Sequence, residues 1–155
     1  IVVGGEKEAV EKVKDLCIEF GARRVIELKV SGPFHTSLLE SASVKLKEEL
    51  EKVEFKKPEV NIISNVTADF INDEEEIRET LYKQVKSSVR WNESINKMLD
   101  MGIDTFVELG PGRVLSGFVK EISRDRSLKV NIFNVEDLKS LNKTLEGIGG
   151  LNDKK

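Results

Sequence analysis

Hydrophobic residues along the chain recur at two different spacings. In several segments they fall every three or four positions, which places them on one face of a helix. The helices predicted from this spacing cover residues 6–20, 37–52, 73–85, 91–100, 114–122 and 138–148. Gly21 follows the first of them, where a glycine commonly ends a helix, and Asn72-Asp73 precedes an acidic first turn in the third.

Shorter runs rich in Val, Ile and Leu lie between these helices and predict strands. The predicted strands cover residues 1–3, 24–30, 60–64, 105–109 and 130–133. Because strands and helices alternate, the pattern favours an α/β fold with a mainly parallel sheet. Residues 149–155, at the end of the chain, are predicted to fray.

The helical spacing also predicts which side chains face the core. In the helix 37–52 the expected inner side chains are Leu39, Ala42, Leu46, Leu50 and Val53. In the last helix they are Leu138, Leu141, Leu145 and Ile148. Both stripes are expected to be buried against neighbouring elements.

The composition limits the class of protein. The chain has 155 residues, the size of one common domain, with a net charge of -3 and one cysteine, Cys17. The near balance of charges argues against a dedicated nucleic-acid binder, and a single cysteine excludes a disulfide framework and fits a reducing compartment. No apolar run approaches the roughly 20 residues of a membrane-spanning helix. We therefore expect a cytoplasmic protein that binds neither nucleic acid nor membrane.

The first residues are unusual for the start of a domain. Ile1-Val2-Val3 is a bare apolar strand, and an unpaired apolar strand invites aggregation. We therefore expect either that preceding residues have been removed or that the chain is the later part of something longer.

His35 is the only histidine, and it follows Gly32-Pro33-Phe34 in a loop after a predicted strand. Functional loops of α/β folds lie at the carboxyl ends of strands. There an imidazole can act as a general base if a hydroxyl or thiol lies within reach, although a plain surface histidine is the alternative. One histidine and Cys17 on an apolar helix face do not make a zinc site, so no metal or cofactor is expected.

Gly110-Pro111-Gly112 forms a second candidate loop. It is either a plain tight turn or a place where backbone N–H groups approach an anion at a helix start. The chain contains neither a phosphate-binding loop nor a nucleophile elbow. If His35 is a base, its nucleophile lies elsewhere.

Several short motifs, in their order and spacing, resemble those of the malonyl-CoA:acyl carrier protein transacylase family. The resemblance runs from Ile1 to about Ile122 and is to the C-terminal half of that family. The motifs are Ile1-Val2-Val3-Gly4-Gly5, Val30-Ser31-Gly32-Pro33-Phe34-His35, Ile63-Ser64-Asn65-Val66-Thr67-Ala68, Gln84 with Val89-Arg90-Trp91, and Phe106-Val107-Glu108-Leu109-Gly110-Pro111-Gly112 before Val114-Leu115-Ser116-Gly117.

The resemblance implies part of an α/β-hydrolase-like acyltransferase domain with the second half of an inserted ferredoxin-like subdomain. Residues 1–30 would belong to the small subdomain and residues 31–155 to the C-terminal part of the large one. The family's Gly-His-Ser nucleophile elbow is absent from these residues. The N-terminal half of the same enzyme is therefore an expected partner.

The resemblance also implies a reaction, the transfer of a malonyl group from coenzyme A to the phosphopantetheine thiol of acyl carrier protein in fatty-acid biosynthesis. His35 matches the family's catalytic base, and the backbone carbonyl of Gln84 would orient its imidazole. Phe34 matches a position that shapes the acyl pocket, with loop packing as the alternative. Asn65 lies near the site by analogy, with a turn or cap as the alternative, and Lys120 is either a contact for an acidic carrier protein or a solvated lysine.

Two further interpretations of the whole chain remain open. One is an acyltransferase domain of a polyketide synthase, and the other is a non-catalytic module that keeps the fold and its carrier-protein contacts. The presence or absence of a Gly-His-Ser serine upstream in the same polypeptide separates the catalytic from the non-catalytic interpretation.

Overall fold

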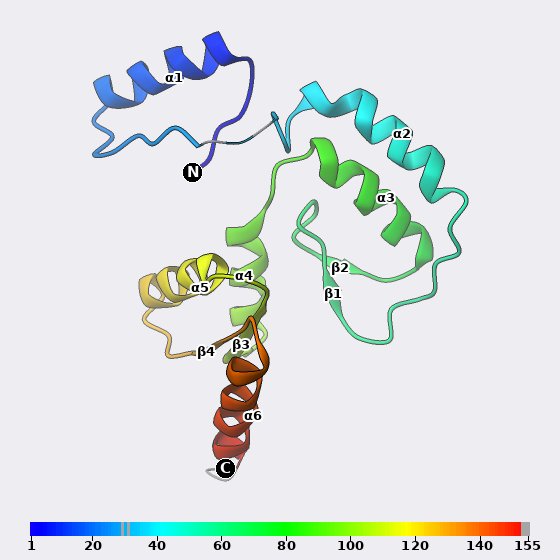
Figure 1. The fold of residues 1–155 in the computed structure, drawn as a ribbon, viewed down its shortest axis with the longest axis vertical. Coiled ribbons are helices and arrows are strands. Elements are labelled where there is room, and N and C mark those ends of the chain that lie inside the picture. The colour runs from blue at the N-terminus through cyan, green and yellow to red at the C-terminus, as the bar shows by residue number, and fades with distance from the viewer. Residues whose placement is uncertain (29, 31, 153–155) are drawn as a thin grey trace. The chain divides into compact units, whose positions relative to one another are not determined.

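A computed structural model describes residues 1–28, 30 and 32–152 of the chain (Figure 1). The chain divides into two compact units, Ile1–Trp91 and Asn92–Lys155. In the first unit the elements are α1 (Lys7–Glu19), a 3-10 turn η1 (Ser37–Leu39), α2 (Glu40–Leu50), β1 (Ile62–Ile63), β2 (Phe70–Ile71) and α3 (Glu74–Lys86). Helix α4 (Trp91–Asp100) begins at the boundary, and β3 (Thr105–Leu109), α5 (Val114–Asp125), β4 (Asn131–Val135) and α6 (Leu138–Asn152) follow it.

The ends of α1 and α3 form as their sequences predict. After α1 the N–H of Ala22 donates to the carbonyl of Cys17 at 2.8 Å, and Gly21 has the positive φ that this Schellman arrangement needs. At the start of α3 the carboxylate of Asp73 accepts from the N–H of Glu76 at 2.8 Å. The Glu76 carboxylate in turn accepts from the N–H of Asn72 at 2.7 Å. Both predicted helix boundaries are confirmed within a few residues.

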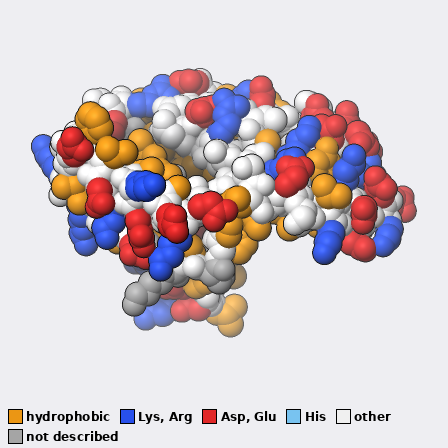
Figure 2. Space-filling view, turned by 90° about the horizontal axis from the view of Figure 1, so that it is seen from above, with side chains coloured by type: hydrophobic (Ala, Val, Ile, Leu, Met, Phe, Trp, Pro, Cys, Tyr) orange, Lys and Arg blue, Asp and Glu red, His pale blue; other side chains and the backbone are white. Residues whose placement is uncertain are grey.

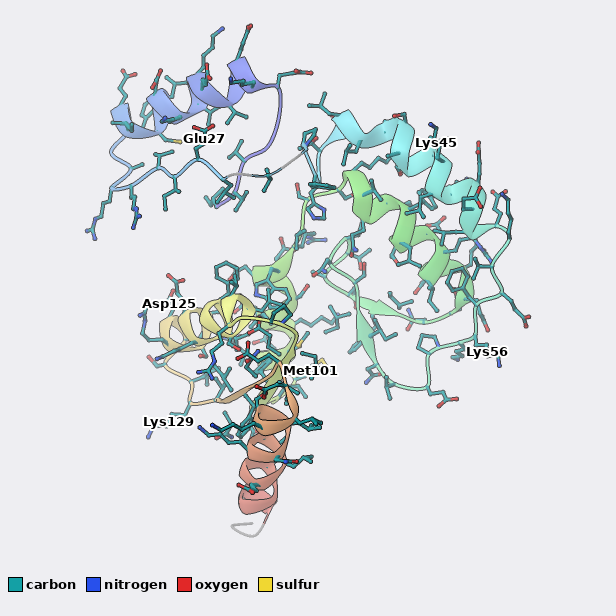
Figure 3. All side chains as sticks on the ribbon, in the orientation of Figure 1. Glu27, Lys45, Lys56, Met101, Asp125 and Lys129 are labelled. Carbon is teal, nitrogen blue, oxygen red and sulfur yellow. The ribbon has the colours of Figure 1, made fainter. Side chains whose placement is uncertain are left out.

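Helices α2 and α3 lie side by side in the first unit (Figure 1). Ser43 is almost fully buried between them and donates a hydrogen bond to the carbonyl of Tyr82 at 2.7 Å. Lys45 lies on the face of α2 turned away from α3 (Figure 3). The predicted inner face was therefore partly wrong: Ala42 and Val53 are exposed, because the contact is centred on a small serine that lets the helices approach closely.

Strands β1 and β2 form a short antiparallel ladder in which Ile62 pairs with Ile71. The turn between them is closed by hydrogen bonds from Ser64 to Asp69 and from Ala68 to Ser64. The sequence predicted a longer strand, at 60–64, in place of β1, and it did not predict β2. The expectation of one mainly parallel sheet is wrong for this unit, since its only ladder within the described residues is antiparallel.

The strands predicted at 1–3 and 24–30 do not form among the described residues, and Lys29 of the second lies outside them. A strand needs a neighbour to satisfy its backbone N–H and C=O groups, and no described strand pairs with either segment. Their apolar side chains are exposed instead: Ile1, Val2, Val3, Ile26, Leu28 and Val30.

The second unit contains the parallel β–α–β arrangement that the alternating pattern predicts. Strands β3 and β4 pair in parallel, with Thr105 opposite Asn131 and Leu109 opposite Val135, and α5 connects them. Ile95, Leu99 and Val119 are buried and form the apolar core of this unit. The guanidinium of Arg126, after α5, forms an ion pair with Asp100 of α4 at 2.6 Å.

Helix α6 packs on β4 through small residues rather than through leucines. Thr144 is buried, and a methyl group added at Gly147 would lie 2.5 Å from Cε1 of Phe133 in β4. The predicted inner stripe was wrong for Leu138, Leu141 and Leu145, which are exposed, whereas Ile148 is half-buried. The helix also continues to Asn152, past the start of the predicted frayed end; residues 153–155 lie outside the described part of the chain.

The loop 110–112 is held by side chains of its own unit. Carboxylate oxygens of Glu108 accept from the N–H groups of Leu115 (3.1 Å) and Ser116 (2.8 Å) and from the Ser116 hydroxyl (2.5 Å). Glu136 accepts from the N–H of Gly112 at 3.1 Å, and the amide of Asn134 donates to the Gly112 carbonyl at 2.7 Å. The start of α5 is therefore already occupied by a carboxylate of the same chain, which favours the tight-turn interpretation.

The contact between α6 and β4 makes a testable prediction. Substitution Gly147→Ala should lower the free energy of unfolding by about 1–3 kcal/mol, the usual cost of forcing a methyl group into a packed contact. Gly149→Ala is the matched control, since among the described residues no atom outside the backbone of α6 lies within 4 Å of a methyl group at that position. The measurement is a urea unfolding curve for each variant. Equal midpoints for the two variants would contradict the packing described here.

A second prediction concerns Glu108. The hydrogen bonds from Ser116 and Leu115, with the Ser116 hydroxyl foremost, hold the pKa of the Glu108 carboxyl below its usual range. A carboxyl group whose pKa is lower in the folded state than in the unfolded state stabilises the fold at any pH above its unfolded-state pKa. This contribution is lost as the pH falls through the folded-state pKa.

We therefore expect Glu108→Gln to be less stable than the parent at pH 7, with the difference shrinking as the solution is acidified through about pH 5 to 3. Thermal unfolding followed across that interval measures it. Glu121→Gln, which removes an exposed carboxylate from α5, is the control and should follow the parent. A difference that is constant with pH would show that the charge of Glu108 has no role.

Candidate active site

His35 lies in the short loop between Gly32 and η1, which we call the His35 loop (residues 32–36). The hydroxyl of Thr36 donates to the carbonyl of Pro33 at 2.7 Å, and the N–H of Phe34 donates to the carbonyl of Gly32 at 2.9 Å. His35 itself has φ 61°, in the left-handed region that few residues other than glycine adopt. Such a conformation persists only where the surroundings hold it, and it is common at functional sites.

The surroundings that hold His35 are the last carbonyl groups of α3. Its backbone N–H donates to the carbonyl of Val85 at 3.1 Å, and its Nδ1 lies 2.9 Å from the carbonyl oxygen of Gln84. The last four carbonyls of a helix have no partner within the helix, so they are available to a neighbouring segment. The contact expected between His35 and the Gln84 carbonyl is present.

This contact fixes the protonation pattern of the neutral ring. A carbonyl oxygen only accepts hydrogen bonds, so the hydrogen of the neutral imidazole is on Nδ1 and the lone pair is on Nε2. The His35 side chain is exposed, and Nε2 makes no hydrogen bond within the described part of the chain. The imidazole is thus oriented on one side and open on the other, the arrangement that a general base requires.

Phe34 directly precedes His35 in the same loop. Its side chain is 58% exposed, so it is not buried in the packing of the loop, although its ring lies against Gly32. This exposure leaves the ring free to contact a bound molecule.

Asn65 lies in the turn between β1 and β2 and is tied to the chain that follows α3. Its carbonyl accepts from the N–H of Arg90 at 2.8 Å, and the Arg90 guanidinium donates to the carbonyl of Thr67 at 2.7 Å. No hydrogen bond joins Asn65 to His35 among the described residues. The structure therefore shows a turn contact for the backbone of Asn65 and leaves its side chain without an assigned role.

No hydroxyl or thiol side chain in the described ranges hydrogen-bonds to His35. These ranges also contain no group of three or more side chains suited to a metal ion, and no helix among them is long and apolar enough to cross a membrane. Sequence analysis missed the Val85 carbonyl, because a backbone acceptor has no side-chain signature. It also missed Glu108, whose charge within an otherwise apolar strand was a usable signal.

The chain was compared with known proteins. No family model matches it. Among curated proteins, the malonyl CoA-acyl carrier protein transacylase of Bacillus subtilis (strain 168) is 48% identical over 124 residues, which is 80% of this chain and 39% of that protein. The transacylase of the same name from Staphylococcus aureus (strain COL) is 37% identical over 142 residues, covering 92% of this chain and 46% of its own length.

Solved structures give the same result. The malonyl CoA-acyl carrier protein transacylase of Clostridium perfringens matches with a TM-score of 0.84 and 43% identity, over 93% of this chain and 44% of that one. A malonyl-transacylase in complex with its type II PKS acyl-carrier protein matches with a TM-score of 0.86 and 38% identity, over 92% and 45%. The chain is therefore homologous to malonyl CoA-acyl carrier protein transacylases over most of its own length, and it spans less than half of theirs.

Proposed function

We propose that the chain supplies the general base of a malonyl-CoA:acyl carrier protein transacylase, with His35 as the base and the Gln84 carbonyl as the group that orients it. The observation that carries this proposal is the 2.9 Å contact between Nδ1 of His35 and the carbonyl oxygen of Gln84, with Nε2 left open. The similarity to transacylases in sequence and fold supplies the reaction.

In the proposed first half-reaction, Nε2 of His35 takes the proton of a serine hydroxyl while the serine oxygen attacks the thioester carbonyl of malonyl-CoA. The tetrahedral intermediate collapses with cleavage of the carbon–sulfur bond, and the imidazolium returns its proton to the departing CoA thiolate. In the second half-reaction Nε2 takes the proton of the phosphopantetheine thiol of acyl carrier protein. The thiolate then attacks the acyl-serine ester, and the serine oxygen recovers the proton.

The carbonyl of Gln84 has two roles in this scheme. It keeps the hydrogen on Nδ1, so the lone pair of Nε2 faces the reacting hydroxyl. It also lies at the C-terminal end of α3, where the helix dipole favours a positive charge of the kind that the imidazolium carries during each half-reaction. A neutral acceptor at a helix end thus does the work that a carboxylate does in a Ser-His-Asp triad.

The serine belongs, in this proposal, to the half of a transacylase that the chain does not span. Exposed apolar side chains support such a partner, because apolar surface in water favours burial against another part of a protein. These side chains include Ile1, Val2 and Val3 at the start of the chain and Leu138, Leu141 and Leu145 on α6. Figure 2 shows apolar side chains between acidic and basic ones on the face it presents.

The division into residues 1–30 of a small ferredoxin-like subdomain and 31–155 of the large domain belongs to the same proposal. So do the substrate contacts of Phe34 and Asn65, the partners malonyl-CoA and acyl carrier protein, a place in fatty-acid biosynthesis and a cytoplasmic location. They rest on the homologous transacylases and on the exposed position of Phe34 beside His35.

Replacement of His35 tests the proposed base. In the full-length protein, His35→Ala should slow formation of the malonyl-enzyme by about 10²- to 10⁴-fold, the usual contribution of a general base. Gln84→Ala is the control and should keep most of the activity, because the backbone carbonyl remains. Quenched-flow measurement of acyl-enzyme formation from malonyl-CoA gives both rates.

Acylation of His35→Ala at the parent rate would refute the proposed base, and absence of acylation in the parent would favour a non-catalytic module. A loss in Gln84→Ala as large as that in His35→Ala would show that the Gln84 side chain takes part.

The exposed ring of Phe34 leads to a prediction on substrate choice. Phe34→Ser should raise kcat/KM for methylmalonyl-CoA relative to malonyl-CoA by about tenfold, since one methyl group in an apolar pocket is worth roughly that factor or more. Phe20→Ser replaces another exposed phenylalanine, after α1, and should leave the ratio unchanged. The ratio is measured by competition between the two thioesters. The same ratio in Phe34→Ser and the parent would assign Phe34 to packing alone.

A further inference from the structure

An ion pair joins the first residue of α2 to the last residue of α3. The ammonium group of Lys86 lies 2.6 Å from Oε1 and 2.7 Å from Oε2 of Glu40, so it contacts both carboxylate oxygens. The Lys86 side chain is 30% exposed and the Glu40 side chain 56%. The pair is thus partly shielded on the lysine side.

Each member of this pair is close in sequence to one partner of the contact between His35 and the Gln84 carbonyl. Glu40 follows His35 by way of η1, and Lys86 follows Gln84 and Val85 at the end of α3. The same two helix ends are therefore joined by the hydrogen bonds of His35, by the Glu40–Lys86 ion pair and, one turn further, by the buried bond from Ser43 to Tyr82.

The position of the ion pair distinguishes it from others in this unit. Glu79 pairs with Lys83 within α3 (2.6 Å), and Glu49 near the end of α2 pairs with Lys52 in the turn that follows the same helix (2.7 Å). Pairs of that kind stabilise their own helix and cannot set the distance between two helices. The Glu40–Lys86 pair spans α2 and α3, so it restrains the start of α2, and with it His35, against the end of α3.

Such a restraint matters because the imidazole contact is exposed. Water competes with the Gln84 carbonyl for Nδ1, and a single hydrogen bond of this kind contributes little net free energy. A small displacement of α2 along α3 would lengthen the contact and free the ring to exchange its two tautomers. Misplacement of a catalytic group by even about 1 Å is costly to the rate.

We propose that Glu40 and Lys86 are positioning residues, whose ion pair holds the His35 imidazole against the Gln84 carbonyl and so keeps its hydrogen on Nδ1. Only the catalytic consequence rests on the proposed function; the effect on the imidazole stands without it.

The first test reads the imidazole directly. His35 is the only histidine of these 155 residues. In the full-length protein, whose expected Gly-His-Ser segment carries another histidine, the ¹⁵N signals that disappear in His35→Ala identify those of His35. In the parent protein Nδ1 should show the shift of a protonated nitrogen and Nε2 that of an unprotonated one. In Glu40→Gln and in Lys86→Met the two shifts should move toward each other as the tautomers mix. The exchanged pair, Glu40→Lys with Lys86→Glu, should restore the parent values.

The matched control is Glu79→Gln, which breaks an ion pair of the same length within α3 and should leave both shifts unchanged. High salt gives an independent check, since screening weakens partly exposed pairs. At about 1 M NaCl the parent shifts should approach those of Glu40→Gln. Circular dichroism verifies that each variant is folded.

The second test measures malonyl transfer in the same variants. Glu40→Gln and Lys86→Met should lower kcat about twofold to fivefold, the range set by the strength of a partly exposed pair, and leave KM for malonyl-CoA unchanged. The exchanged pair should recover kcat. A change in KM with constant kcat would contradict a positioning role.

The outcomes separate this proposal from the proposed function. Unchanged imidazole shifts in folded Glu40→Gln and Lys86→Met would overturn the positioning role, whatever the activity. Shifted signals together with full acylation by His35→Ala would support the positioning role and refute the proposed base. Shifted signals that the exchanged pair does not restore would also overturn the proposal, because they would assign the effect to packing rather than to charge.

Discussion

Two carbonyl groups at the end of α3, which no N–H of that helix can reach, determine the geometry of the candidate site. One accepts from the backbone of His35 and the other from its imidazole, so backbone and side chain are fixed together. This double contact is consistent with the positive φ of His35, a conformation that would relax in an unrestrained loop. Helix α2 packs on α3 through Ser43 and the Glu40–Lys86 pair, and this packing holds the start of α2 near the end of α3.

At the N-terminal end of α5 the unpaired backbone groups have a purely structural role. At the start of α5 the unpaired N–H groups are satisfied by Glu108, and the neighbouring loop is held by Asn134 and Glu136. The positive end of that helix is therefore neutralised within the unit and serves structure. The negative end of α3 is used instead to orient a ring.

Much of this fold could be predicted from local sequence, because helix spacing and caps are local signals. The Asp73 cap, the end of α1 at Gly21 and the parallel strands around α5 are of this kind. The faces of α2 and α6 could not, since small residues such as Ser43 and Gly147 set the contacts and have no place in a hydrophobic pattern. The prediction of strands at 1–3 and 24–30 was wrong, because a strand forms only beside a second strand, which a local sequence pattern does not reveal. His35 was found from its residue type, whereas Gln84 followed only from a family resemblance, since a main-chain acceptor leaves no mark on the sequence.

The identity of the His35 partner has a consequence for the chemistry of the site in acid. A carboxylate in the same place would lose its charge on acidification and turn from acceptor into donor, so the orienting contact would itself depend on proton concentration. A peptide carbonyl does not titrate. The Gln84 carbonyl therefore accepts a hydrogen bond at every pH at which α3 stays folded, and the acceptor itself adds no titrating group to the site.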